Sequence, residues 1–215
     1  MAAHSFGKTC PPARSELGAD TRFKKVSTMT ETEIVNATRK WVEDVVVGYN
    51  LCPFAKKELV RDRVRFVVSD AADEDTLLQA LHSELQRLDE EPEVETTVLI
   101  HPGVLQDFEA YNEFLDAADG LLAYLDMEGV YQIASFHPDY QFAGTDPESA
   151  ENYTNRSPYP MLHLLREASL EAAVESHPDV DGIPGRNIKL TEELGVETMR
   201  EALLNCIKSS KTPGE

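Results

Sequence analysis

The stretch YQIASF at residues 131–136 decides the fold, because it is the third of three short apolar runs that helical patterns separate. The other two runs are VRFVV at 64–68 and TTVLI at 96–100. Leucines recur at helical spacing between the first two runs, and a longer apolar helical pattern precedes the third. This alternation predicts an α/β fold with a small layered sheet of about three or more strands, mostly parallel and flanked by helices. A ferredoxin-like α+β arrangement is the alternative, because strand direction is inferred only.

Further helices are predicted on either side of these runs. One begins after Thr30 or Thr32 and ends in a left-handed turn at Gly48, and a second begins at Pro53. A third starts at Pro160 and runs to about Ser176. After a polar stretch, a last helix is predicted near 191–209.

Composition limits the classes of partner. The chain has 215 residues and a formal net charge of −19, so general nucleic-acid binding is disfavoured. No apolar run has the length of a spanning helix, which disfavours a membrane role. Three scattered cysteines fit reduced thiols better than a disulfide framework. We therefore expect a soluble cytoplasmic protein with a small-molecule ligand, and the sequence leaves both the oligomeric state and the cofactor undetermined.

The domain organisation follows from the ends of the chain. Residues 1–28 lack apolar periodicity and carry more basic than acidic side chains, whereas helical periodicity starts directly after Met29. We expect a disordered leader at 1–28, a single globular domain at 29–209 and a flexible tail at 210–215. An upstream start codon also explains the leader. A transit peptide is the weaker explanation, and it would place the protein in a plastid or another organelle.

Polar side chains follow two of the predicted strands. His101 comes after the second strand and His137 after the third, and a proline follows each histidine. The carboxyl ends of parallel strands share one edge of a sheet, where open α/β sheets bind ligands. Both histidines are therefore expected at a functional edge.

The segment after His137 is the richest in polar chemistry. An irregular connection of about 23 residues before the next element exceeds ordinary loop lengths and indicates a functional loop. His137 and Asp139 can act as base and acid or as metal ligands. Asn155 and Arg156 offer donors to a carboxylate or a phosphate. The structural alternative is a loop whose polar groups satisfy one another.

Cys52 is the candidate nucleophile. A helix starting at Pro53 would place its thiol beside a helix N-terminus, which favours a thiolate. The basic residues that follow would favour the thiolate as well: Lys56, Lys57, Arg61, Arg63 and Arg65. The structural alternative is a small buried hydrophobe beside a solvated helix.

His163 and Glu167 stand four residues apart in the helix predicted after Pro160. At that spacing the two side chains share one helix face. They can form a metal-ligand pair, an oriented general base or, most commonly, a surface ion pair.

Four ordered blocks resemble an uncharacterised family of bacteria and plastid-bearing organisms, catalogued as domain of unknown function fourteen-fifteen. The blocks are LCPFA, SFHPDYQF, NYTNRSPYP and LHLLREAS, and the resemblance runs from about Trp41 to Ala173. It implies no catalytic role for any residue. It marks one recurring constellation: Cys52, Pro53, Phe54, His137, Asp139, Tyr140, Asn152, Asn155, Arg156, Ser157, His163, Arg166 and Glu167.

Three functions fit these residues. The first is a cysteine-dependent hydrolase or transferase acting on a small anionic metabolite, with Cys52 as nucleophile, His137 as base and Asp139 or Asn155 orienting the imidazole. Its substrate contacts are predicted to be Tyr140, Asn155, Arg156, Ser157, His163, Arg166 and Glu167. The second is a metal-dependent enzyme with ligands from His137, Asp139, His163 and Glu167. The third is a non-catalytic binding or scaffold protein.

Overall fold

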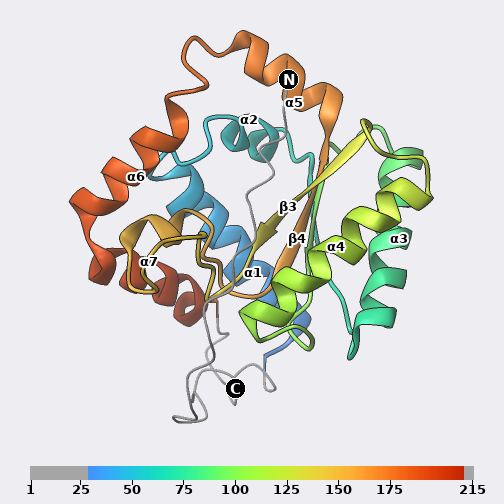
Figure 1. Ribbon diagram of the computed structural model, residues 1–215, viewed down its shortest axis with the longest axis horizontal. Coiled ribbons are helices and arrows are strands. Elements are labelled where there is room, and N and C mark those ends of the chain that lie inside the picture. Colours follow the sequence, from blue (N-terminus) through green and yellow to red (C-terminus); the bar gives the residue numbers. More distant parts are fainter. Residues whose placement is uncertain (1–28, 211–215) are drawn as a thin grey trace.

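A four-stranded mixed sheet organises residues 29–210, the part of the chain that the computed structural model describes (Figure 1). Its strands are β1 (Val64–Val68), β2 (Thr96–Ile100), β3 (Tyr131–Phe136) and β4 (Met161–Arg166), in the spatial order β1-β2-β4-β3. β1 and β2 pair in parallel, and β4 runs antiparallel to both of its neighbours. The first three strands therefore point the same way. The α/β class is confirmed, but the sheet is not mostly parallel as predicted, because β1–β2 is the one parallel pair among its three strand pairs. The order of elements along the chain is not the β-α-β-β-α-β order of the ferredoxin-like alternative.

β4 corrects the helix predicted from Pro160 to Ser176. Residues Met161–Arg166 form a strand, and only Glu167–Ser176 is helical, as α5. The strand fills the slot between β2 and β3, where both neighbours offer backbone hydrogen-bonding groups. Its alternating side chains serve two layers, because Leu162 and Leu164 enter one core and Met161 enters the other.

One face of the sheet is covered by α3 (Glu74–Glu90) and α4 (Phe108–Tyr124). Each helix begins at an aspartate whose side chain accepts a backbone N–H: Asp73 caps α3 and Asp107 caps α4. The leucine stripe of α3 and the aromatic residues of α4 form the main core with the sheet. Its fully buried members include Leu77, Leu81, Leu85, Leu88, Leu99, Tyr111, Leu162 and Leu164.

The other face packs against α1 (Glu31–Trp41), its π-helical continuation η2 (Val42–Val47) and α7 (Val196–Ser209). Gly48 was predicted to end the first helix in a left-handed turn, but its φ is −58°. Asn50, with φ of 54°, takes that conformation instead.

The C-terminal region contains two helices where the sequence predicted one at 191–209. The first, α6 (Ile183–Leu194), begins within the polar stretch that preceded the predicted helix, and a proline lies in its first turn. Gly195, with φ of 80°, separates α6 from α7, because a backbone with positive φ cannot continue a right-handed helix and glycine adopts it without a steric penalty.

Predictions for residues 1–28 and 211–215 lie outside the described residues. Within 29–210, no helix has the length and apolarity needed to cross a membrane. The short helix α2 (Ala55–Val60) begins after Phe54, two residues later than the start predicted at Pro53.

Candidate functional site

Tyr111 of α4 brings the two rim histidines together at the carboxyl ends of β2 and β3. The ring of His101, which follows β2, stacks on the ring of Tyr111 with centroids 5.8 Å apart. The ring of His137, which follows β3, lies 5.1 Å from the Tyr111 ring centroid. The Tyr111 hydroxyl donates to Met161 O at 2.8 Å and accepts from Phe136 N at 3.0 Å. It therefore bridges the adjoining ends of β3 and β4, and the predicted placement of both histidines at this edge is confirmed.

His137 itself is fully buried and both of its ring nitrogens are engaged. Nδ1 accepts from Asp139 N at 3.0 Å, so Nε2 carries the proton and donates to Leu105 O at 3.2 Å. Burial lowers the pKa of His137, which keeps the ring neutral. This geometry argues against the predicted role as a base and favours a ring that positions the start of the loop.

The loop between β3 and β4 satisfies many of its own polar groups. Asn152 Oδ1 accepts from Phe142 N at 3.0 Å, and its Nδ2 donates to Asp146 O at 2.9 Å. Asn155 Nδ2 donates to Ser135 O at 3.1 Å, and Ser157 Oγ donates to Tyr159 O at 2.7 Å. Asn155 and Ser157 were predicted to contact the substrate. Their hydrogen bonds instead favour a loop whose polar groups satisfy one another.

Tyr140, another predicted substrate contact, packs within an aromatic group. Its ring centroid lies 5.2 Å from that of Phe108 and 5.0 Å from that of Phe142. Its carbonyl accepts from Arg156 Nε at 3.1 Å. Tyr140 therefore shapes the loop and anchors the guanidinium group of Arg156.

A cleft of about 530 Å³ opens between this loop and α7. Asp139 and Arg156 are the two predicted site residues that line it. The full lining is Phe108, Pro138, Asp139, Gln141, Pro147, Glu148, Tyr153, Arg156, Arg200, Leu203 and Leu204. The cleft thus combines two guanidinium groups, two carboxylates and an apolar wall.

The guanidinium group of Arg156 is fixed by its own loop. Besides Tyr140 O, it donates through Nη2 to Pro147 O at 2.6 Å. Its Cζ lies 4.7 Å from the ring centroid of Tyr153, which is buried. A planar cation held on an aromatic face is pre-organised, so little side-chain entropy remains to be lost on binding an anion.

Arg200 of α7 lies at the other end of the same phenol ring. Its Nη2 donates to Glu148 Oε2 at 2.8 Å and its Nη1 to Glu197 Oε2 at 2.7 Å. Interaction with the Tyr153 hydroxyl and with these carboxylates raises the pKa of Arg200. Sequence reasoning missed Arg200 and Glu148, because neither lies in a motif block and a helical surface arginine carries no distinguishing spacing.

Residues 33–201 match the family described as Protein of unknown function (DUF1415). The chain belongs to this family. The match confirms the resemblance that the four blocks indicate. No curated protein and no solved structure matches the chain.

The first family block, LCPFA, contributes no residue to the cleft lining. Asn187 Nδ2 of α6 donates to Leu51 O at 2.7 Å, and Arg186 Nη2 donates to Asn50 O at 2.7 Å. Cys52 precedes α2 by three residues and is not its cap. Among the hydrogen bonds and ring contacts of residues 29–210, none joins Cys52 to His137. Cys52 is a free thiol and is more exposed than the buried Cys206.

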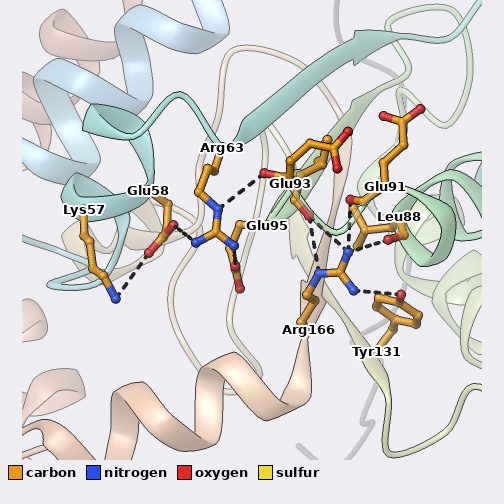
Figure 2. A network of polar contacts seen from close by, with 10 residues as sticks. Lys57, Glu58, Arg63, Leu88, Glu91, Glu93, Glu95, Tyr131 and Arg166 are labelled. Atoms are coloured by element: carbon orange, nitrogen blue, oxygen red, sulfur yellow. Dashed lines mark hydrogen bonds and ion pairs between the residues drawn. The ribbon is translucent and has the colours of Figure 1, made fainter.

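Three of the basic residues after Cys52, namely Lys57, Arg63 and Arg65, are paired with carboxylates, as Figure 2 shows for Arg63 and Lys57. Arg63 contacts Glu95 and, at 3.4 Å, Glu58. Arg65 donates through Nε to Glu84 Oε2 at 2.7 Å. These pairs tie β1 to α2, α3 and the start of β2. They indicate a structural role for Arg63 and Arg65 rather than activation of a thiol.

The last family block contains three predicted site residues on β4 and the start of α5. His163 contacts Thr96 Oγ1 at 2.7 Å in mid-sheet, and burial lowers its pKa. Arg166 donates to Val94 O at 3.1 Å and also to Leu88 O and the Tyr131 hydroxyl (Figure 2). It therefore closes the amino end of the sheet, because Arg166 pairs in register with Tyr131, the first residue of β3.

The helical pairing of His163 with Glu167 was wrong, since His163 lies in β4 and Glu167 begins α5. The metal set is also divided between the two ends of the sheet: His137 and Asp139 follow β3, whereas Glu167 follows β4. Within the described part of the chain, no three His, Cys, Asp or Glu residues gather as metal ligands do.

A second cleft of about 590 Å³ lies at the carboxyl ends of β1 and β2, and half of its lining residues are acidic: Asp73, Glu74, Asp75 and Asp107. Two of these acids already act as helix caps. Asp73 Oδ1 accepts from Thr76 N at 2.8 Å, and Asp107 Oδ1 accepts from Ala110 N at 3.0 Å. The acidic lining is thus accounted for in part by capping.

Proposed function

We propose that this protein is an enzyme whose substrate is a small organic anion, bound as a carboxylate in the cleft between the β3–β4 loop and α7. The observation that carries the proposal is that Arg156 and Arg200 line the same cleft. The apolar part of the same lining suits the carbon skeleton of such a substrate. It is formed by Phe108, Leu203 and Leu204.

Guanidinium groups are suited to this role because their planar fork matches the geometry of a carboxylate. Arg156 already has its plane fixed by Tyr140 O, Pro147 O and the Tyr153 ring. In a chain of net charge −19, most of the surface repels anions. Two cations in one concave site supply the local attraction that an anionic ligand requires.

The enzymatic part of the proposal rests on Asp139. Of the three predicted catalytic residues, Cys52, His137 and Asp139, the cleft lining includes Asp139 alone. Its backbone N–H is fixed by His137 Nδ1, so His137 serves as a positioning residue. We assign Asp139 the transfer of a proton to or from the bound substrate. The free thiols Cys52 and Cys206 support a reducing, cytoplasm-like location as part of this proposal.

The test is a titration of the full chain with butyrate, followed by NMR chemical shifts. Butyrate offers one carboxylate and a short apolar segment, and inorganic phosphate offers charge without that segment. We expect butyrate to shift resonances of the cleft residues more strongly than phosphate does.

Two variants locate the binding site. Arg156→Gln removes the anchoring charge, and Leu204→Glu introduces a repelling carboxylate at a wall position outside both core clusters. Both should abolish butyrate binding. Arg87→Gln removes an exposed guanidinium from α3 and should bind as the wild type does. Unchanged binding in both cleft variants, or no response of the wild-type chain, would contradict the proposal.

A further inference from the structure

An ion pair crosses the candidate cleft from one wall to the other. Glu148 belongs to the β3–β4 loop and Arg200 to α7, and their side chains meet at 2.8 Å. Both residues line the cleft, together with Arg156. The Glu148 carboxylate of the chain itself therefore already binds Arg200, one of the two cations of the site.

We infer that the Glu148 carboxylate stands where a second anionic group of the ligand binds, so that the substrate class is a short dicarboxylate held by Arg156 and Arg200. This inference rests on the proposed function and narrows it. Glu148 is then an internal competitor that the substrate displaces from Arg200.

The ion pair has the properties of a displaceable contact. Glu148 has 71% and Arg200 39% of its side chain exposed. Exposed ion pairs contribute little to stability, because water screens the charges and holding both side chains costs entropy. A carboxylate that is already tethered at Arg156 can therefore replace Glu148 without a large loss.

Arg200 keeps its place when Glu148 leaves. Its Nη1 still donates to Glu197 Oε2, one turn earlier on the same helix, at 2.7 Å. Its contact with the Tyr153 hydroxyl also remains. Release of Glu148 thus exposes Nη2 of a guanidinium group that two other contacts hold in position.

Tyr153 sets the length of the substrate. Arg156 lies over the face of this ring, with Cζ 4.7 Å from the centroid, and Arg200 lies at its hydroxyl end. Tyr153 is only 4% exposed, so its ring is a fixed spacer. Two carboxylates joined by two or three methylene groups match a separation on the scale of one phenol ring. Succinate and glutarate have this length.

The inference is tested by comparing dicarboxylates with monocarboxylates of the same chain length. Succinate is compared with butyrate, and glutarate with valerate, by titration of the full chain. Once one carboxylate is bound, the second is held near its site at a high effective concentration, which raises the affinity. We therefore expect the better dicarboxylate to bind at least about tenfold more tightly than the monocarboxylate of the same chain length.

Variants that neutralise one charge at a time assign the effect. Arg200→Gln should remove the dicarboxylate advantage while monocarboxylates still bind at Arg156. Glu148→Gln removes the internal competitor and should tighten dicarboxylate binding severalfold. Arg87→Gln, the surface control, should keep the wild-type preference.

The two proposals fail in different ways. If monocarboxylates bind in an Arg156-dependent manner but dicarboxylates gain no advantage, or Arg200→Gln keeps the advantage, the dicarboxylate inference is overturned and the anion site stands. If neither series binds, the proposed function is overturned as well. Weaker dicarboxylate binding in Glu148→Gln would also overturn the role of Glu148 as a competitor.

Discussion

Replacing Tyr111 by phenylalanine should destabilise the fold by about 2–3 kcal/mol. The Tyr111 side chain is fully buried, and its hydroxyl inserts between Phe136 N and Met161 O, which are opposite residues of β3 and β4. The substitution removes two hydrogen bonds of about 1 kcal/mol each and leaves a backbone donor and acceptor with a desolvation penalty of about 1–3 kcal/mol. A partial direct bond between the strand ends offsets some of this penalty.

The assay is equilibrium unfolding in urea, with the slope of the transition compared between variants. For a chain of this size, a loss of 2–3 kcal/mol corresponds to a fall of about 4–12 °C in the melting temperature. Tyr124→Phe is the matched control, because Tyr124 lies on the same helix and is 83% exposed. It should change the unfolding free energy by less than about 0.5 kcal/mol. A Tyr111→Phe effect as small as that of the control would refute the bridging role of the hydroxyl.

Two further predictions concern His101 and the thiols. Burial lowers the pKa of His101 to about 4 in the folded chain. Since an unfolded histidine titrates near pH 6.5, its contribution to stability is complete above that pH and is lost as the pH falls toward 4, by about 1.4 kcal/mol per pH unit. Urea unfolding between pH 7 and 5 should show a shallower pH dependence for His101→Gln than for the wild type; equal slopes would contradict this. For the thiols, iodoacetamide should modify Cys52 at least about tenfold faster than Cys206, because Cys206 is 1% exposed and burial raises its pKa to about 11. Peptide mapping by mass spectrometry measures the modification of both thiols. Cys52→Ser should leave the slow modification rate of Cys206 unchanged, and comparable rates at the two thiols would show that Cys206 is accessible.

The three strands predicted from sequence have the same bounds in the structure, whereas β4 was assigned to a helix. Apolar runs such as TTVLI at 96–100 are rich in β-branched residues and bounded by polar ones, which favours strands. MLHLLR at 161–166 is rich in leucine, which favours helices, and its burial on both faces removes the alternation that marks a strand. The strand conformation of residues 161–166 is decided by pairing with β2 and β3 on either side. That pairing exists only in the tertiary structure, so the local sequence does not reveal it.

The candidate site was predictable in part. The length and polar density of the β3–β4 loop indicated its importance, and Asp139 and Arg156 do line the cleft. Arg200 was not predictable, because its position opposite the loop depends on how α7 packs. The basic residues near Cys52 gave a false signal for a similar reason: the carboxylates that neutralise Arg63 and Arg65 come from positions 32 and 19 residues further along the chain.

The position of β4 in the sheet has a consequence for protein synthesis. Residues Met161–Leu165 of β4 pair with residues of β2 made 61 to 69 positions earlier, and β4 also separates β2 from β3. While the ribosome has yet to release Met161–Arg166, both earlier strands keep an unpaired side, and such edges template association between chains. Pairing over such long separations also slows folding, because the entropy of loop closure is lost before the favourable strand contacts form. Nascent chains of this protein that stall before Met161 should therefore depend on chaperones far more than chains that stall after α5.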